Sequence, residues 1–154
     1  MTGALLLTNL AVTLFLTGLV WVLQVVQFPL LLRVPGDDFV AYVRTQRKRN
    51  TLLMALPMLV ELITAIWLLV TPLPHRNVFH ALVLLGFVWF VTFWSIVPLH
   101  LKLVRGYDES AIRILIRDNW IRTVCWTGRA GFMLWITWNW IPWSSITASG
   151  LQGH

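Results

Sequence analysis

The chain is poor in charged residues and in cysteine. Only 12% of its 154 residues are charged, whereas soluble domains carry about 25%. Hydrophobic residues make up 58%, and the mean hydropathy is +0.74. This balance excludes a water-soluble globule and leaves room for one domain over residues 1–154. The single cysteine, Cys125, excludes an intramolecular disulfide and a thiolate metal cluster.

Motifs of soluble enzymes are also missing. The sequence contains no GxSxG, HExxH, P-loop or dinucleotide-binding pattern, so it signals no soluble-enzyme chemistry and leaves open whether the protein is an enzyme. The net charge is +6, but the basic residues lie between apolar runs and form no single basic face. We therefore expect no nucleic-acid partner.

Four long apolar stretches fill most of the chain. They cover residues 4–32, 51–70, 78–101 and 121–146, and a helix of roughly 20 apolar residues crosses a bilayer. The first stretch has no basic leader and exceeds signal-peptide length, so we expect it to be retained. The fold class predicted is all-α, a polytopic membrane protein with four transmembrane helices.

The positive charges lie mainly in two of the three connections. The connection after the first span holds Arg33, Arg44, Arg47, Lys48 and Arg49, and the one after the third holds Lys102, Arg105, Arg113, Arg117 and Arg122. The middle connection has only Arg76, and neither tail has Lys or Arg. By the positive-inside rule, both long connections are cytoplasmic and both termini lie outside a bacterial inner membrane. An aromatic belt is expected at Trp135, Trp138, Trp140 and Trp143.

Both basic connections resemble short amphipathic helices. The first follows a turn signal over residues 35–38, and the second follows Gly106, Tyr107 and Asp108. We expect two short cytoplasmic helices that lie in the interface and meet the anionic headgroups of the bilayer.

The two halves of the chain also resemble each other. Pro29 to Arg33 and Pro98 to Lys102 have similar sequences, and each leads through Gly and Asp to an asparagine, Asn50 or Asn119. The offset of 69 to 70 residues predicts two parallel helical-hairpin repeats about an axis along the membrane normal.

Two charged residues lie deep in predicted spans. Glu61 is the only acid inside a span, and Arg129 occupies a nearly equivalent depth in the other half. A carboxylate in the bilayer needs a partner, and Arg129 is the natural counter-ion. The pair is either structural, fixing helix register, or part of a ligand or proton site.

A polar stripe descends the fourth span towards Glu61. Asn119, Arg122, Trp126 and Arg129 follow at spacings of three, four and three, which places them on one helix face. His100, Gln24 and Gln27 lie at the same end of their spans. Together these side chains predict a polar cavity that opens to the cytoplasm and is closed by Trp126. The alternative is that each makes only headgroup contacts or interhelical hydrogen bonds.

Cofactors are not identified by the sequence. His80 and His100 lie twenty residues apart in one span, or about 30 Å, so they cannot share a metal ion or a haem, and we predict no metal site. Trp89, Phe90, Phe93 and Trp94 are an aromatic set that either stacks on a quinone or carotenoid or packs against helices and lipid.

The sequence resembles a family of small uncharacterised bacterial four-helix membrane proteins. The motifs that carry this resemblance are VxFPLL…R from Val26, PMLxE from Pro57, VPLH from Val97 and NWIRTxxW…R from Asn119. The family pattern often has a histidine where this chain has Gln27. The resemblance implies the four-span fold and the importance of Glu61, His100, Asn119, Arg122 and Arg129, but it implies no reaction.

These patterns together favour a cytoplasm-facing cavity for a small anionic or amphiphilic ligand. Arg122 and Arg129 would hold the anion, Glu61 would neutralise Arg129 in the empty state, and Asn119 and His100 would orient the ligand. Two other functions stay open: an accessory subunit packed against other membrane proteins or copies of itself, and a small proton-coupled exporter that uses Glu61.

Overall fold

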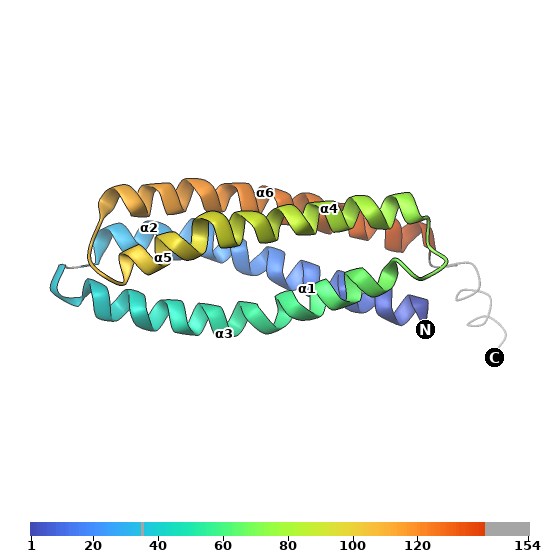
Figure 1. The fold of residues 1–154 in the computed structure, drawn as a ribbon, viewed down its shortest axis with the longest axis horizontal. Coiled ribbons are helices and arrows are strands. Elements are labelled where there is room, and N and C mark those ends of the chain that lie inside the picture. Colours follow the sequence, from blue (N-terminus) through green and yellow to red (C-terminus); the bar gives the residue numbers. More distant parts are fainter. Residues whose placement is uncertain (35, 141–154) are drawn as a thin grey trace, which may run out of the picture.

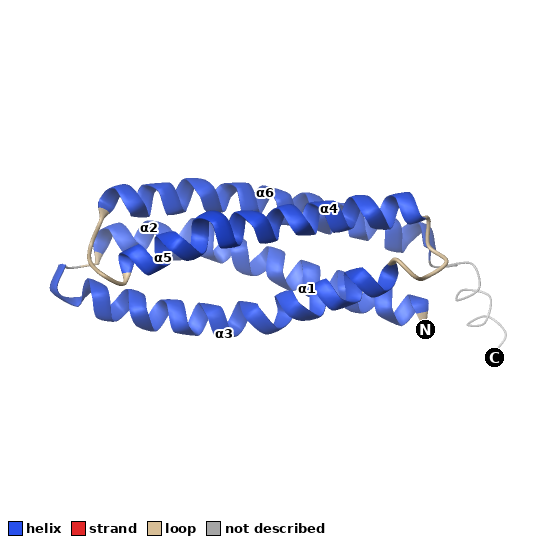
Figure 2. Ribbon diagram, viewed as in Figure 1, coloured by secondary structure: helices blue, strands red, loops and turns tan. Residues whose placement is uncertain are grey.

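The computed structural model describes residues 1–34 and 36–140, and these residues form four long helical rods that lie side by side (Figures 1 and 2). The first rod comprises α1 (Thr2–Val22), the π-helical turn η1 (Leu23–Gln27), α2 (Phe28–Leu30) and the 3-10 turn η2 (Leu31–Arg33). The second rod is α3 (Gly36–Leu68). The third comprises α4 (His75–Val91), the π-helical turn η3 (Thr92–Ile96) and α5 (Val97–Leu103), and the fourth is α6 (Glu109–Trp140). No strand occurs within the described ranges.

Three of these rods are long and apolar enough to cross a membrane. They are Thr2–Arg33, Gly36–Leu68 and His75–Leu103, and they indicate a membrane protein. Thr2–Arg33 and His75–Leu103 include the first and third predicted spans with a few residues added at each end. Gly36–Leu68 begins fifteen residues before the second predicted span, 51–70, and ends two residues before its predicted end. The predicted fourth span begins inside α6 and runs to residue 146, so residues 141–146 and Trp143 lie outside the described part of the chain. Trp135 and Trp138, from the expected aromatic belt, are exposed.

The prediction of two short, separate interfacial helices in the connections was wrong. Residues 37–50 form the first turns of α3, which continues without a break to Leu68, and residues 109–120 form the first turns of α6. No glycine or proline occurs between Asp37 and Leu56 or between Glu109 and Thr127, so nothing in the sequence stops either helix. The basic residues therefore sit on extensions of the rods.

Two π-helical turns interrupt the first and third rods at an offset of 69 residues. Each turn ends two residues before a proline, Pro29 or Pro98. Proline has no N–H, so it leaves the carbonyl four residues earlier without its helical partner. Those carbonyls belong to Val25 and Trp94, and both lie within the π turns. Single π turns commonly mark functional positions in helices.

A buried polar layer divides the bundle into two apolar clusters. Leu16, Met58 and Trp126 belong to one cluster, and Leu6 and Met133 belong to the other. The polar layer lies between these positions on α1, α3 and α6. The long packing interfaces join α3 to α1, α1 to α6, and α6 to α4, whereas α3 meets α4 and α5 over a smaller area.

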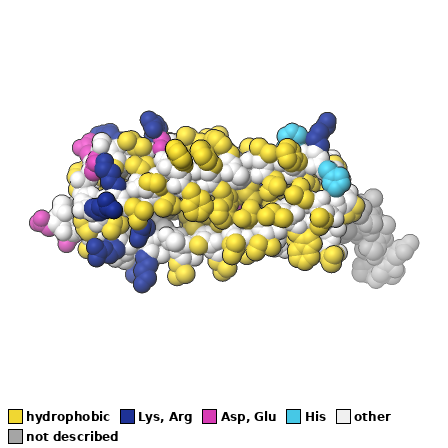
Figure 3. All heavy atoms as spheres, viewed as in Figure 1, with side chains coloured by type: hydrophobic (Ala, Val, Ile, Leu, Met, Phe, Trp, Pro, Cys, Tyr) yellow, Lys and Arg dark blue, Asp and Glu magenta, His cyan; other side chains and the backbone are white. Residues whose placement is uncertain are grey.

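The charged side chains gather at the end of the bundle where α3 and α6 begin (Figure 3). The turn before α6 is tightly held there. Asp108 accepts hydrogen bonds from Ser110 Oγ at 2.5 Å and Ala111 N–H at 2.9 Å, and Lys102 Nζ lies 2.6 Å from its other oxygen. The Lys102 ammonium and these two donors hold the pKa of Asp108 well below its usual range. This contact fixes the start of α6 against the end of α5.

Candidate functional site

The centre of the polar layer is a buried ion pair between α3 and α6. Arg129 Nε donates to Glu61 Oε1 over 2.9 Å, and both side chains are fully buried. Thr13 Oγ1 donates to the same carboxylate oxygen at 2.6 Å, and Trp126 Nε1 donates to Oε2 at 3.2 Å. The pairing of Glu61 with Arg129, predicted from depth alone, is thus present in the structure.

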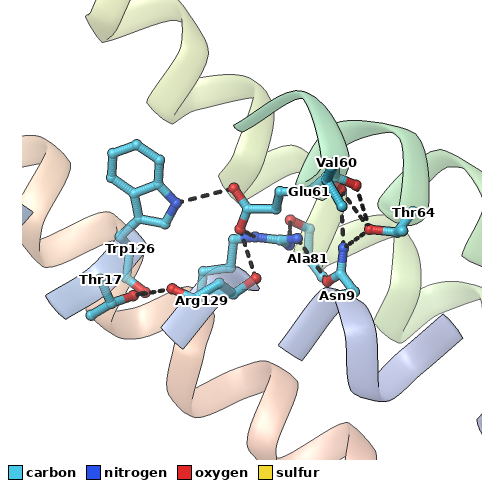
Figure 4. Close-up of polar contacts among 9 residues, drawn as sticks. Asn9, Thr17, Val60, Glu61, Thr64, Ala81, Trp126 and Arg129 are labelled. Carbon is cyan, nitrogen blue, oxygen red and sulfur yellow. Dashed lines mark hydrogen bonds and ion pairs between the residues drawn. The ribbon is translucent and has the colours of Figure 1, made fainter. Parts of the chain in front are cut away.

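Both Nη nitrogens of Arg129 also donate hydrogen bonds. Nη1 donates to the Ala81 carbonyl of α4 at 2.7 Å, and Nη2 donates to Asn9 Oδ1 at 3.1 Å. Asn9 in turn donates to the Glu61 carbonyl and to Thr64 Oγ1. Figure 4 shows that these side chains point towards one another from α1, α3 and α6, with the Ala81 backbone carbonyl of α4 beside them. We call this set the Glu61–Arg129 network: Asn9, Thr13, Glu61, Thr64, Trp126 and Arg129.

The Glu61–Arg129 network has a structural role, because its charged groups hold four helices together. Both carboxylate oxygens accept hydrogen bonds, and all three guanidinium nitrogens donate them. Buried charges are stable only when they are paired and saturated in this way. Every side-chain nitrogen and oxygen of Glu61 and Arg129 has at least one partner, whereas the buried atoms without a partner lie elsewhere.

A cavity of about 340 Å³ lies between α3 and the rod formed by α4, η3 and α5. We call it the α3–α5 cavity. Its walls are mainly apolar, and it lies where the packing of α3 is least extensive. The apolar lining comprises Leu23, Phe28, Met54, Ala55, Met58, Leu59, Trp89, Phe93, Ile96 and Val97. Leu59 and Phe93 are exposed on the outer surface, so the cavity opens sideways between α3 and η3.

The polar lining is spread along the cavity. Arg47, Asn50, Thr51 and His100 lie towards the charged end of the bundle, and Thr92 and Arg122 lie deeper. No Asp or Glu lines the cavity, so the two guanidinium groups make its polar lining positively charged. Small-molecule sites typically have about 300 Å³ or more of apolar space with a few convergent polar groups. The α3–α5 cavity has both features.

Several lining groups are buried without a hydrogen-bond partner. They include Arg122 Nε, His100 Nδ1 and Trp89 Nε1. The Arg122 and Trp89 atoms carry N–H groups that can only donate, and the imidazole nitrogen donates in one tautomer. Buried polar groups are normally hydrogen-bonded. Residues that line the cavity therefore carry the unsatisfied polar atoms.

Arg122 is itself held in place by the helix that carries it. Its Nη1 donates to Asn119 Oδ1 at 3.2 Å, and its guanidinium carbon lies 5.2 Å from the centre of the Trp126 ring. Asn119 also donates to Gln24 Oε1 at 2.8 Å. Because Trp126 bonds to Glu61 as well, one tryptophan joins the cavity to the Glu61–Arg129 network.

The seven predicted site residues do not line one cavity. His100 and Arg122 are at its wall. Asn119 and Trp126 support Arg122 from behind, and Gln27 accepts from Asn50 Nδ2 at 2.9 Å and from Gln46. Glu61 and Arg129 form the separate network. The expectation that all seven line one cavity was wrong: only His100 and Arg122 line the α3–α5 cavity, and Trp126, which was expected to close it, bonds to Glu61 in the separate network.

Sequence reasoning assigned no site role to Arg47, Asn50 and the α3 methionines. Arg47 was grouped with the headgroup contacts, yet the continuous α3 helix places it on the face of Asn50 and Met54. On α1, Asn9 and Thr13 are spaced four residues apart, a helical stripe of polar residues in an apolar span that signals buried partners. In the described part of the chain, no group of three His, Cys, Asp or Glu side chains could hold a metal ion.

No protein-family model, curated protein or solved structure matches this chain.

Proposed function

We propose that this protein is a four-span bacterial inner-membrane protein that binds an anionic amphiphile in the α3–α5 cavity. The fourth span is the second part of α6. Residues 123–140 contain one charged side chain, Arg129, and extend about 27 Å. Arg129 is buried and paired, so it does not prevent insertion. α6 also packs along both α1 and α4.

The membrane orientation follows from the positive-inside rule. Most of the basic residues lie at the end of the bundle where α3 and α6 begin. That end is cytoplasmic, and both chain termini lie on the other side. The halves are parallel hairpin repeats, which the π turns at matching positions support. Arg47 and His100 then lie near the cytoplasmic interface, while Met58 and Trp89 lie within the hydrocarbon.

One observation carries the ligand assignment: Arg122 is buried in the wall of a mainly apolar cavity, and its Nε–H has no hydrogen-bond partner. An acidic headgroup supplies the missing acceptor and the missing negative charge. His100 and Arg47 lie on the walls around the same headgroup, and the apolar walls accept its hydrocarbon tail. The sideways opening lets a lipid-soluble ligand enter from the bilayer.

The contacts of Glu61 weigh against the exporter alternative. An exporter that exchanges a proton for a cation needs a carboxylate that can release its partner. Here Arg129, Thr13 and Trp126 all donate to Glu61 within a buried layer. The exposed apolar faces of the rods are what a lipid-facing surface requires, so they do not single out an accessory subunit.

The proposal is tested by calorimetric titration of the purified protein in mild detergent with dodecanoate and with dodecanol. We expect the wild type to prefer dodecanoate. Arg122→Gln should weaken dodecanoate binding about 10- to 100-fold, as expected for a hydrogen bond to a charged group, and should leave dodecanol binding nearly unchanged. Arg113→Gln is the matched control, because it removes an exposed arginine from the same helix. Equal binding of dodecanoate by Arg122→Gln and the wild type would refute the proposal.

A further inference from the structure

The wall of the α3–α5 cavity carries two positive charges that no carboxylate balances. Arg122 is buried, Arg47 is half-buried, and no Asp or Glu lines the cavity with them. In the described part of the chain, the ion pairs use other cations, namely Lys102, Arg113, Arg117 and Arg129. An arginine keeps its charge in proteins. A single carboxylate headgroup would therefore balance only one of the two guanidinium groups.

The head of Arg122 reaches back towards the part of the cavity where Arg47 lies. Its Nη1 donates to the side chain of Asn119, one turn nearer the charged end. Two glutamines of the π turn η1 relate this level to α3, since one accepts from Asn119 and the other from Asn50. These glutamines lie three residues apart, and Arg47 precedes Asn50 by three residues. The Arg47 backbone thus lies about 9 Å along the bundle from the Arg122 head, within reach of one headgroup for a long side chain.

His100 belongs to the same part of the cavity. It interacts electrostatically with both Arg122 and Arg47. Its ring packs against Phe28, which directly follows η1, with centroids 5.7 Å apart. Side chains from α3, α5 and α6 therefore converge on one region from three walls.

We infer that the headgroup of the ligand is a dianion, a phosphate monoester on an apolar chain, and that Arg47 balances its second charge. The inference rests on the proposed function, because Arg122 provides the site for the first charge. A phosphate monoester carries close to two negative charges at neutral pH and has three terminal acceptor oxygens. An ionised carboxyl group carries one charge on two oxygens. The phosphate therefore matches both the charge of the cavity wall and the three directions from which its polar side chains come.

The test compares dodecyl phosphate with its methyl ester, on the purified protein in mild detergent. Both probes have the same chain and a phosphorus centre, but the methyl ester has only one ionisable oxygen. At pH 8, about two units above the second pKa of a phosphate monoester, we expect the wild type to bind dodecyl phosphate about 10-fold more tightly, as for one bond to a charged group. Arg47→Gln should abolish this preference, and Arg47→Lys, which keeps the charge, should retain most of it.

Arg44→Gln is the matched control, because it removes an exposed arginine three residues away on the same helix. It should leave the preference unchanged. Each preference is a ratio between two probes on one preparation, so it does not depend on the fraction of folded protein. Inorganic phosphate is the third probe, and we expect it not to displace dodecyl phosphate at equal concentration, because it lacks the chain that the apolar walls accept.

The outcomes separate this inference from the proposed function. If both probes need Arg122 but the wild type binds them equally, the dianion is overturned and the headgroup site stands. A preference that persists in Arg47→Gln, or that Arg44→Gln abolishes equally, also overturns the inference. Displacement by equal inorganic phosphate would assign the site to the free anion instead of an amphiphile. If neither probe depends on Arg122, the proposed function itself fails.

Discussion

Replacing Arg129 by methionine removes the cation at the centre of the bundle while keeping a long apolar side chain there. The change deletes the hydrogen bonds to Glu61, to the Ala81 carbonyl and to Asn9. Glu61 remains fully buried with only Thr13 and Trp126 as donors. Removing one partner of a buried ion pair costs about 3 to 5 kcal/mol, so we expect the free energy of unfolding to fall by that amount.

A double-mutant cycle measures how much of this loss is the pair itself. Glu61→Leu alone should cost about as much as Arg129→Met, since it leaves an unpaired buried guanidinium. The double variant buries no charge, and we expect it to lie within about 2 kcal/mol of the wild type, the remaining loss arising from donors and acceptors left unsatisfied. The two losses should therefore be far from additive.

The assay is reversible unfolding in mixed micelles by titration with dodecyl sulfate, followed by circular dichroism. The matched control is the same cycle on Glu109 and Arg113, an exposed pair four residues apart on α6, whose removal should change stability by less than about 0.5 kcal/mol. The structural role of the pair would be refuted if each single variant lost less than about 1 kcal/mol of unfolding free energy. It would also be refuted if the losses of the two single variants added up in the double variant.

Three further predictions concern the cavity and the turn beside it. Trp126→Phe keeps a ring under Arg122 but loses the hydrogen bond to Glu61. The free energy of unfolding, measured by the same titration, should therefore fall by about 1 kcal/mol. The affinity for dodecanoate should fall less than in Arg122→Gln. Met58→Trp should fill the apolar end of the cavity and abolish hexadecanoate binding in calorimetry while leaving the helical circular dichroism spectrum unchanged. Asp108→Asn should speed amide exchange at residues 109–112 at neutral pH. Because the pKa of Asp108 is lowered in the folded protein, its stabilising contribution is present above pH 4 and is lost as the pH falls further. The exchange rates of wild type and variant should therefore converge in acid.

Much of the fold could be predicted from hydropathy and charge. Apolar runs of bilayer length predict the rods, because a helix must satisfy its own backbone groups in lipid. The depth of Glu61 predicts its pairing with Arg129, since an unpaired carboxylate is too costly there. The helix ends were less well predicted. The polar turns of α3 and α6 looked like separate helices because composition changes at residue 50 and near residue 120, whereas the backbone has no reason to break.

The shape of the site could not be predicted from spacing on one helix. The stripe from Asn119 to Arg129 shares a face, but the side chain of Trp126 divides that face into a closed network and an open cavity. Which side of Trp126 holds free donors depends on the packing of α3 against α5, and therefore on residues far apart in the sequence. Trp89 and Met58 come to line the same cavity only through that tertiary contact.

The most direct test of the central claim is photo-crosslinking of the protein, in bilayers, with hexadecanoate that carries a diazirine near the end of its chain. The attachment sites are then mapped by mass spectrometry. The account predicts adducts on cavity residues such as Met54, Met58 and Ile96, and their loss in Arg122→Gln but not in Arg113→Gln. Adducts spread over the outer faces of all rods, at equal yield in both variants, would contradict it.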